Sequence, residues 1–194
     1  MRFIEGLDAR AKILRSASKL FSVNTLDGTS IRDIARDAGV SETALYRHFP
    51  SKDAMAFFLF SEIITHYTQL IRPIKDTPLC AVDRLIAIVS ITYDLYERYP
   101  EAIRFALLSQ YNYWDRLDPE KKPHYVFKEI IEDGLAQGEF PSREVYFYIT
   151  LFTGIMLQPL AQFSYFSDVL PETPVLRNCV SQMIKLTLTQ GGLQ

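Results

Sequence analysis

The stretch that decides the fold is TSIRDIARDAGVSETALYRHFPSK, residues 29–52. It predicts two short helices joined by a turn at Gly39, where a left-handed residue ends the first helix. Thr29 and Ser30 are suited to cap the first helix, and Ser41 is suited to cap the second. This is the helix-turn-helix layout, which places the second helix in a DNA major groove. The apolar residues of the first helix recur at helical spacing: Ile31, Ile34, Ala35 and Ala38.

The second helix is expected to have an inner and an outer side. Leu45 and Phe49 are four residues apart and face the core, whereas Glu42, Thr43, Tyr46 and Arg47 are left outside. Pro50 ends this helix. Such a unit cannot bury its own apolar face, so a preceding helix must complete a three-helix core. That helix supplies Ile13, Leu14, Ala17, Leu20 and Phe21.

Residues about 10–57 resemble the DNA-binding domain of the TetR family of bacterial transcription regulators. The resemblance implies an all-α protein of about nine helices. It also implies a helix-turn-helix DNA-binding domain over residues 1–51 and a helical ligand-binding and dimerisation domain over residues 52–194. The residues that carry the resemblance are Ile13-Leu14, Ala17, Leu20-Phe21, Thr29-Ser30, Asp33-Ile34-Ala35, Ala38-Gly39-Val40-Ser41, Leu45-Tyr46, His48-Phe49 and Ser51-Lys52.

The resemblance also implies which residues touch DNA. Thr29 and Ser30 correspond to residues that contact phosphate at a helix start, and Lys52 to the family's phosphate-binding lysine. The start of the recognition helix is expected to read bases, and its later residues to hold the DNA backbone. In order, these residues are Ser41, Glu42, Thr43 and Ala44 for the bases, and Tyr46, Arg47 and His48 for the backbone.

Three positions depart from the family pattern. Glu42 is acidic where the family is often basic or neutral, and a carboxylate accepts from the N4 amine of cytosine, so Glu42 is a candidate for specificity. Ala44 replaces a common threonine and is limited to contact with a thymine methyl group. Thr25 replaces the family's usual glycine, so Asn24 is expected to take the left-handed conformation instead.

Charge supports an interface at one end only. The 194-residue chain has a net charge of −2, but residues 1–52 hold nine Lys and Arg against six Asp and Glu. The remainder holds twelve against seventeen. A basic head on an acidic body suits a protein that presents one end to phosphates.

Enzyme chemistry is not indicated by the sequence. The three histidines, His48, His66 and His124, form no zinc-binding motif, and the chain has neither a Gly-rich phosphate loop nor a nucleophile elbow. No cofactor or metal site is therefore expected. Without a signal peptide, the protein is expected to be cytoplasmic, with Cys80 and Cys179 as buried reduced thiols.

The body is expected to be helical throughout. One helix continues from Lys52 to about Arg72, Thr77-Pro78 opens the next, and Asp118-Pro119 opens another. Ser142 is expected to cap a helix through the uncharged segment 145–167, whose polar residues argue against a membrane span. Thr173-Pro174 opens the last helix, whose apolar stripe is Leu176, Cys179, Val180, Met183 and Ile184.

The uncharged helix needs more apolar partners than one chain offers, so we expect a homodimer through helices near 142–167 and 173–190 that binds a pseudo-palindromic double-stranded operator. The large residues of the body suit an unknown, mostly apolar small-molecule ligand whose binding releases a repressor from DNA. The alternatives are a regulator without a ligand, an activator, or a helical module that does not act on DNA. The expected ligand residues are Tyr93, Phe105, Tyr111, Trp114, Phe152 and Met156.

Overall fold

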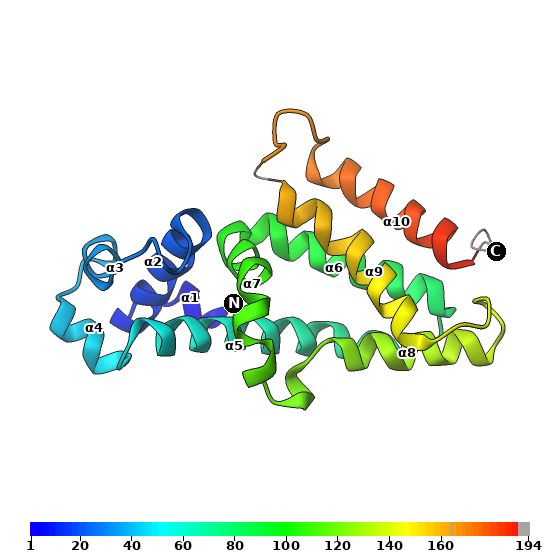
Figure 1. Ribbon diagram of the computed structural model, residues 1–194, viewed down its shortest axis with the longest axis horizontal. Helices are drawn as coiled ribbons and strands as arrows, with labels where there is room; N and C mark the ends of the chain where they lie inside the picture. The colour runs from blue at the N-terminus through cyan, green and yellow to red at the C-terminus, as the bar shows by residue number, and fades with distance from the viewer. Residues whose placement is uncertain (164, 190–194) are drawn as a thin grey trace. The chain divides into compact units, whose positions relative to one another are not determined.

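A computed structural model of the protein describes residues 1–163 and 165–189 (Figure 1). Over these residues the chain forms ten α-helices and three short 3-10 helices and no strand, so the predicted all-α class is confirmed. The tenth α-helix, beyond the nine expected, is the short α1 (Arg2–Glu5). Among the described helices, none combines the length and the apolar character needed to cross a bilayer. Ser164 and residue 190, which belong to segments discussed above, lie outside the described residues.

The chain divides into two compact units, Met1–His66 with Tyr99–Lys121 and Tyr67–Arg98 with Lys122–Gln194. The helix α5 (Lys52–Ile71) begins in the first unit and ends in the second. The functional boundary expected between residues 51 and 52 stays a prediction.

The first unit is built on α2 (Ala9–Asn24), α3 (Ile31–Ala38) and α4 (Glu42–His48). Besides the start of α5 it contains α7 (Pro100–Tyr113) and the 3-10 helices η2 (Trp114–Arg116) and η3 (Pro119–Lys121). α2 packs against α1, α3 and α7. Its core contains most of the apolar residues expected from the sequence: Ile13, Leu14, Ala17, Phe21, Ile34, Ala35 and Leu45 are buried.

The loop between α2 and α3 contradicts one expectation. Asn24 remains helical, and the residue with positive φ is Thr25, at φ 63° and ψ 172°. Gly28 is required nearby, because a Cβ there would lie 2.2 Å from the carbonyl oxygen of Asn24. The loop therefore bends one residue later than predicted, at a residue with a side chain.

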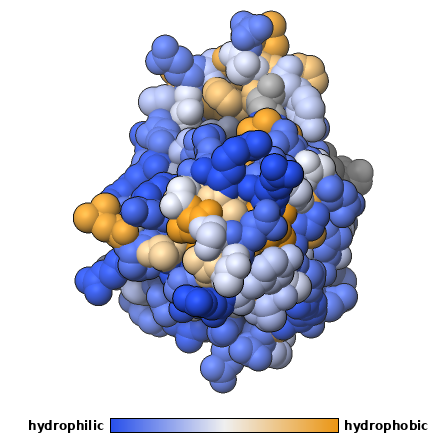
Figure 2. Space-filling view, turned by 90° about the vertical axis from the view of Figure 1, so that its left-hand side faces the viewer, coloured by the Kyte–Doolittle hydropathy of each residue, from blue (hydrophilic) through white to orange (hydrophobic). Residues whose placement is uncertain are grey.

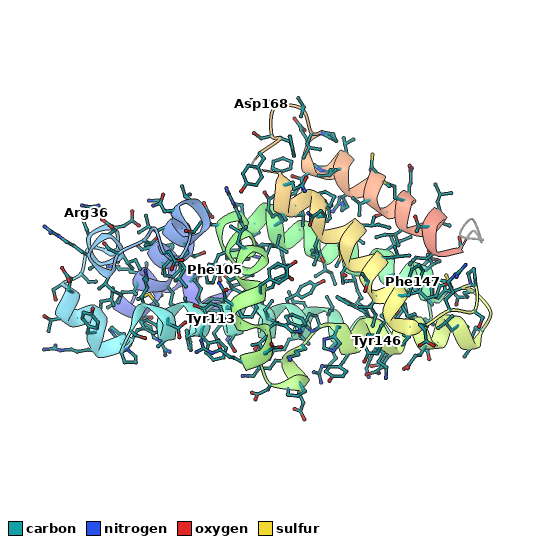
Figure 3. The ribbon with its side chains drawn as sticks, viewed as in Figure 1. Arg36, Phe105, Tyr113, Tyr146, Phe147 and Asp168 are labelled. Carbon is teal, nitrogen blue, oxygen red and sulfur yellow. The ribbon has the colours of Figure 1, made fainter. Side chains whose placement is uncertain are left out.

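Helix α7 is joined to α2 and to the start of α5 through aromatic rings. Phe105 packs on Phe21 with ring centroids 5.4 Å apart. Tyr113, at the end of α7, lies against the rings of Phe57 and Phe60 on α5. Figure 3 labels Phe105 and Tyr113 on this helix. These contacts fix α7 to the α2–α5 framework within the first unit.

The second unit contains the end of α5, the 3-10 helix η1 (Arg72–Asp76) and α6 (Ala81–Arg98). Its other helices are α8 (His124–Ala136), α9 (Val145–Gln162) and α10 (Thr173–Thr189). α6 packs against α8 and α10, and α9 also packs against both (Figure 1). Gly134 of α8 permits a close approach, since a Cβ there would lie 2.7 Å from the Cβ of Ala81 on α6.

The start of α6 differs from the expectation. The helix begins at Ala81 and not at Thr77-Pro78, because the Glu139 carboxylate accepts from the backbone amides of Ala81 (2.9 Å) and Val82 (3.3 Å). These are amides that a helix start leaves without a partner. A residue 58 positions away in the sequence therefore caps this helix. Helix α9 also starts later than expected, at Val145, so Glu144 and not Ser142 occupies its N-cap position.

The two cysteines were wrongly expected to be buried, and the apolar stripe of α10 is buried only in part. Cys80 and Cys179 are exposed free thiols. On α10, Leu176, Val180 and Ile184 are buried, but Met183 is 55% exposed. The helix thus has one buried apolar stripe and a second, exposed one. Cys179 and Met183 belong to the outer stripe.

Candidate nucleic-acid interface

The start of α3 is fixed by a hydrogen-bonded cap. The Ser30 hydroxyl oxygen accepts from the Asp33 amide at 3.1 Å, and the hydroxyl donates to the Asp33 carboxylate at 2.5 Å. That hydrogen bond is the main cause that lowers the pKa of Asp33 below its usual value, and the charges of Arg36 and Arg32 also lower it. Ser30 itself is exposed. The predicted cap is confirmed, and its phosphate contact stays a prediction.

The Thr29 side chain forms hydrogen bonds within the first unit. This side chain is buried, and its hydroxyl donates to the carbonyl oxygens of Thr25 at 2.8 Å and Leu20 at 3.3 Å. A hydroxyl has one donor, and both of these acceptors lie within the protein. In this structure the side chain closes the α2–α3 loop, and the DNA contact implied for Thr29 by the resemblance stays a prediction.

The turn between the two helices follows the prediction. Gly39 has φ 69° and ψ 35°, the left-handed conformation that glycine adopts without steric cost. The Val40 amide then donates to the carbonyl of Ala35 at 3.0 Å, which satisfies one of the last carbonyls of α3. Ser41 caps α4 by accepting from the Ala44 amide at 3.1 Å.

Helix α4 has the expected inner and outer sides. Leu45 and Phe49 are buried, whereas Tyr46 is 51% exposed. The end of the unit that carries α3 and α4 is mainly hydrophilic (Figure 2). The division of α4 is confirmed, and the DNA contacts of its outer residues stay predictions. The other outer residues are Ser41, Glu42, Thr43, Arg47 and His48, which are exposed, and Ala44, which is half-buried.

Lys52 joins the start of α5 to the α2–α3 loop. Its Nζ donates to the carbonyl oxygens of Leu26 at 2.7 Å and Thr29 at 2.9 Å. An ammonium group has three donors, so these two bonds leave one for a phosphate oxygen. Lys52 therefore has a structural role that sequence reasoning missed, because its acceptors are carbonyls 23 and 26 residues away.

Helix α3 adds cations that the family pattern did not single out. Arg36 points outward and its side chain is 76% exposed (Figure 3), although it also pairs with Asp33 at 2.7 Å. Arg32 is exposed on the same short helix. The alternation of arginines with buried Ile34 and Ala35 was the available signal for this basic outer side.

The expected ligand residues are divided between the two units. In the second unit, Tyr93, Phe152 and Met156 are buried, and the Tyr93 hydroxyl donates to the Met156 carbonyl oxygen at 3.3 Å. In the first unit, Phe105 belongs to the core beside α2, Trp114 is half-buried and Tyr111 is 92% exposed. Tyr111 therefore does not line an enclosed pocket in this structure. No group of three His, Cys, Asp or Glu within the described ranges is arranged to hold a metal ion.

Comparison with known proteins gives consistent results. Residues 13–57 match the family described as bacterial regulatory proteins, tetR family. The transcriptional repressor KstR2 of Mycolicibacterium smegmatis is 26% identical over 68% of this chain and 67% of its own length. The probable transcriptional regulator YttP of Bacillus subtilis is 24% identical over 93% of this chain and 92% of its own.

A solved structure shows the same fold over most of the chain. The transcriptional regulator FadR of Bacillus subtilis, in complex with stearoyl-CoA, superposes with a TM-score of 0.72 at 18% identity. The match covers 93% of this chain and 97% of FadR. The capped helix pair, its exposed outer side and the matched residues 13–57 all lead to one assignment. Residues 13–57 carry the DNA-binding domain of the tetR family of bacterial regulatory proteins, and the chain is a DNA-binding transcriptional regulator, not an enzyme.

Proposed function

We propose that this protein is a homodimeric repressor that binds a pseudo-palindromic operator and leaves it when a long, mostly apolar ligand binds. The proposal of DNA binding rests mainly on how α4 is held in the structure. Its caps and its two buried anchors, Leu45 and Phe49, hold the helix in place while every charged residue on it faces solvent. A rigid helix with a polar outer side is what direct readout of base edges requires.

Glu42 is proposed as a base-reading residue. It is exposed in the first turn of α4, the part of a recognition helix that contacts bases in helix-turn-helix proteins. A carboxylate there accepts from cytosine N4 and repels phosphate oxygens, so it favours one base and penalises misplacement. Each half-site would then contain one cytosine position that depends on this side chain.

The experiment for the DNA part is selection of bound duplexes from a random pool, followed by sequencing. We expect a two-fold symmetric motif with half-sites about 34–36 Å apart, one helical turn. Glu42→Ala should relax one base position in each half-site by about tenfold and leave the rest of the motif unchanged. No enrichment at low salt would overturn the DNA-binding proposal. An unchanged motif with Glu42→Ala would overturn only the role of Glu42.

Arg47→Ala tests contact with the DNA backbone, as Glu42→Ala tests contact with bases. Arg47 is exposed near the end of α4, so its removal should weaken binding to all sequences alike. Lys52→Ala is a poorer choice, because it also removes two hydrogen bonds that hold the α2–α3 loop. Weaker binding by Arg47→Ala to the operator alone, and not to other duplexes, would contradict a backbone role.

The outer sides of α9 and α10 support the proposed dimer. Val175, Met183 and Leu186 of α10 are each more than half exposed, on a side of the helix next to the buried stripe. On α9, Tyr146 is exposed near the helix start (Figure 3). A Cβ added at Gly154 would meet no atom within 4 Å among the described residues, apart from the backbone of its own helix and its chain neighbours. A second subunit covering these sides would bury apolar surface and pair two recognition helices.

The ligand class is proposed from the second unit's core. Tyr93, Phe152 and Met156 are large and buried together with Phe127, whose ring contacts Phe152 edge-on at 5.1 Å. Such surroundings suit an acyl chain, and FadR, which shares the fold, is described in complex with stearoyl-CoA. Helix α5, which the two units share, would transmit the effect of ligand binding to the DNA-binding helices. For release, the ligand must bind more tightly to the conformation that binds DNA poorly.

The ligand part is tested with saturated acyl-CoAs of increasing chain length, with free coenzyme A as the control. Calorimetry measures binding to the protein, and fluorescence anisotropy measures release of the selected operator. We expect the long-chain thioesters to bind and to weaken operator affinity by a factor of about 5 to 150, the usual range of coupling. Absence of binding at every chain length would overturn the ligand class and leave the DNA proposal intact.

A further inference from the structure

Arg10, in the first turn of α2, lies over two aromatic rings beside the end of the recognition helix. Its guanidinium carbon is 4.3 Å from the centroid of the Phe58 ring and 5.4 Å from that of Phe49. The two rings contact each other, with centroids 5.7 Å apart. Phe49 directly follows the last residue of α4, and Phe58 lies on α5. The stack therefore holds the guanidinium next to the exposed Arg47 and His48 end of α4.

The N–H donors of the Arg10 guanidinium are not taken up by acceptors among the described residues. Arginine carries five N–H donors. Within residues 1–163 and 165–189, Arg10 donates no hydrogen bond and forms no ion pair, and its side chain is exposed. Two other arginines of the first unit are engaged: Arg15 donates to the carbonyl of Ile4 at 3.0 Å and Arg36 pairs with Asp33. Arg10 is thus a cation with a fixed position and unused donors.

We propose that Arg10 binds a backbone phosphate of the operator, as a contact outside the helix-turn-helix segment. The proposal rests on the proposed function, in which α4 enters the major groove. A phosphate flanking the groove would meet the end of α4, where Arg10 is held. Arginine suits phosphate because its planar fork donates two parallel hydrogen bonds, and stacking on the rings reduces the conformational entropy lost on binding.

The stack also has a structural role, so the test must separate the two. Neutralising one phosphate changes the slope of log affinity against log salt by about 0.9, which a purely structural contact does not do. Lys12 supplies the matched control, because it is an exposed cation two residues further along the same helix. Two residues correspond to about 200° around a helix, so Lys12 points away from the stack.

The experiment measures anisotropy titrations of the selected operator over a range of salt concentrations. The proteins are the wild type, Arg10→Gln, Arg10→Lys and Lys12→Gln. For a dimer with two half-sites, Arg10→Gln should lower the magnitude of the salt slope by about two and weaken binding at least tenfold. It should do so equally on operator and unrelated duplexes, because phosphates carry no sequence. Arg10→Lys should retain most of the slope, and Lys12→Gln should leave it unchanged.

The outcomes separate this inference from the function on which it rests. A wild-type protein that enriches no duplex overturns both. A wild type that binds its operator, with Arg10→Gln weaker but with the same salt slope, overturns the phosphate contact and leaves Arg10 as a support for α4 alone. An equal loss of slope with Lys12→Gln also overturns it, because the effect would then reflect general charge and not this stacked side chain.

Discussion

At the scale of single residues, Thr25 adopts a backbone conformation that is normally reserved for glycine. Its φ of 63° with ψ of 172° costs a residue with a Cβ about 1–3 kcal/mol. Two neighbours hold it there: Thr29 donates to its carbonyl oxygen, and Lys52 binds the carbonyls of Leu26 and Thr29. We predict that Thr25→Gly raises the free energy of unfolding by about 1 kcal/mol, since relief of strain exceeds the extra entropy that glycine loses.

Urea denaturation measures this effect. Asn24→Gly is the matched control, because Asn24 is the last helical residue of α2 and glycine there should lower stability. Equal or reduced stability of Thr25→Gly would show that the loop carries no strain at this position.

His124 gives a pH dependence at the same scale. Burial, and then the charge of Lys122, lower the pKa of His124 below its usual value of 6.5. The folded state therefore binds this proton less readily than the unfolded chain does. Its contribution to stability is complete above pH 6.5 and is lost as the pH falls from 6.5 through the lowered pKa. The denaturation midpoint should fall less over this range in His124→Gln than in the wild type, and parallel curves would contradict the lowered pKa.

At the scale of elements, α5 and α7 are joined by a polar contact as well as by rings. The hydroxyl of Tyr113, a buried residue, donates to the Asp53 carboxylate at 3.0 Å, and Arg116 pairs with the same carboxylate at 3.0 Å. Desolvation, followed by the bond to Asp53, raises the pKa of Tyr113, so the hydroxyl keeps its proton. Tyr113→Phe leaves the packing intact and should lower stability by about 1 kcal/mol, the usual net value of one hydrogen bond.

Thermal unfolding checks this value. The matched control is Tyr111→Phe, the same change two residues earlier on a side chain that is 92% exposed. We expect no measurable effect from it. A loss of stability equal to that of Tyr113→Phe would mean that the α5–α7 hydrogen bond contributes nothing of its own.

At the scale of the whole molecule, the proposed dimer depends on the outer stripe of α10. Met183→Glu places a charge among exposed apolar residues and should convert the dimer to monomers with little effect on the subunit's own core. Analytical ultracentrifugation measures the change, and operator affinity should fall with it because each half-site then binds separately. Leu79→Glu, an exposed leucine before α6, is the control. A Met183→Glu protein that stays dimeric would place the interface elsewhere.

Local chemistry determined the DNA-binding end of this protein. Ser30, Gly39 and Ser41 act within three or four residues of themselves, so their caps and the turn follow from sequence alone. The inner and outer sides of α4 also follow from the sequence, because Leu45 and Phe49 are four residues apart and so lie on the same side of a helix.

Only the tertiary structure decided features that depend on distant partners. Glu139 sets the start of α6, Lys52 is held by loop carbonyls, and the apolar residues of α10 divide between an inner and an outer side. A sequence pattern reports which residues avoid water but not which surface covers them. The partners of Glu139, of Lys52 and of the outer side of α10 are determined when helices far apart in the chain pack together. No local spacing of residues encodes that packing.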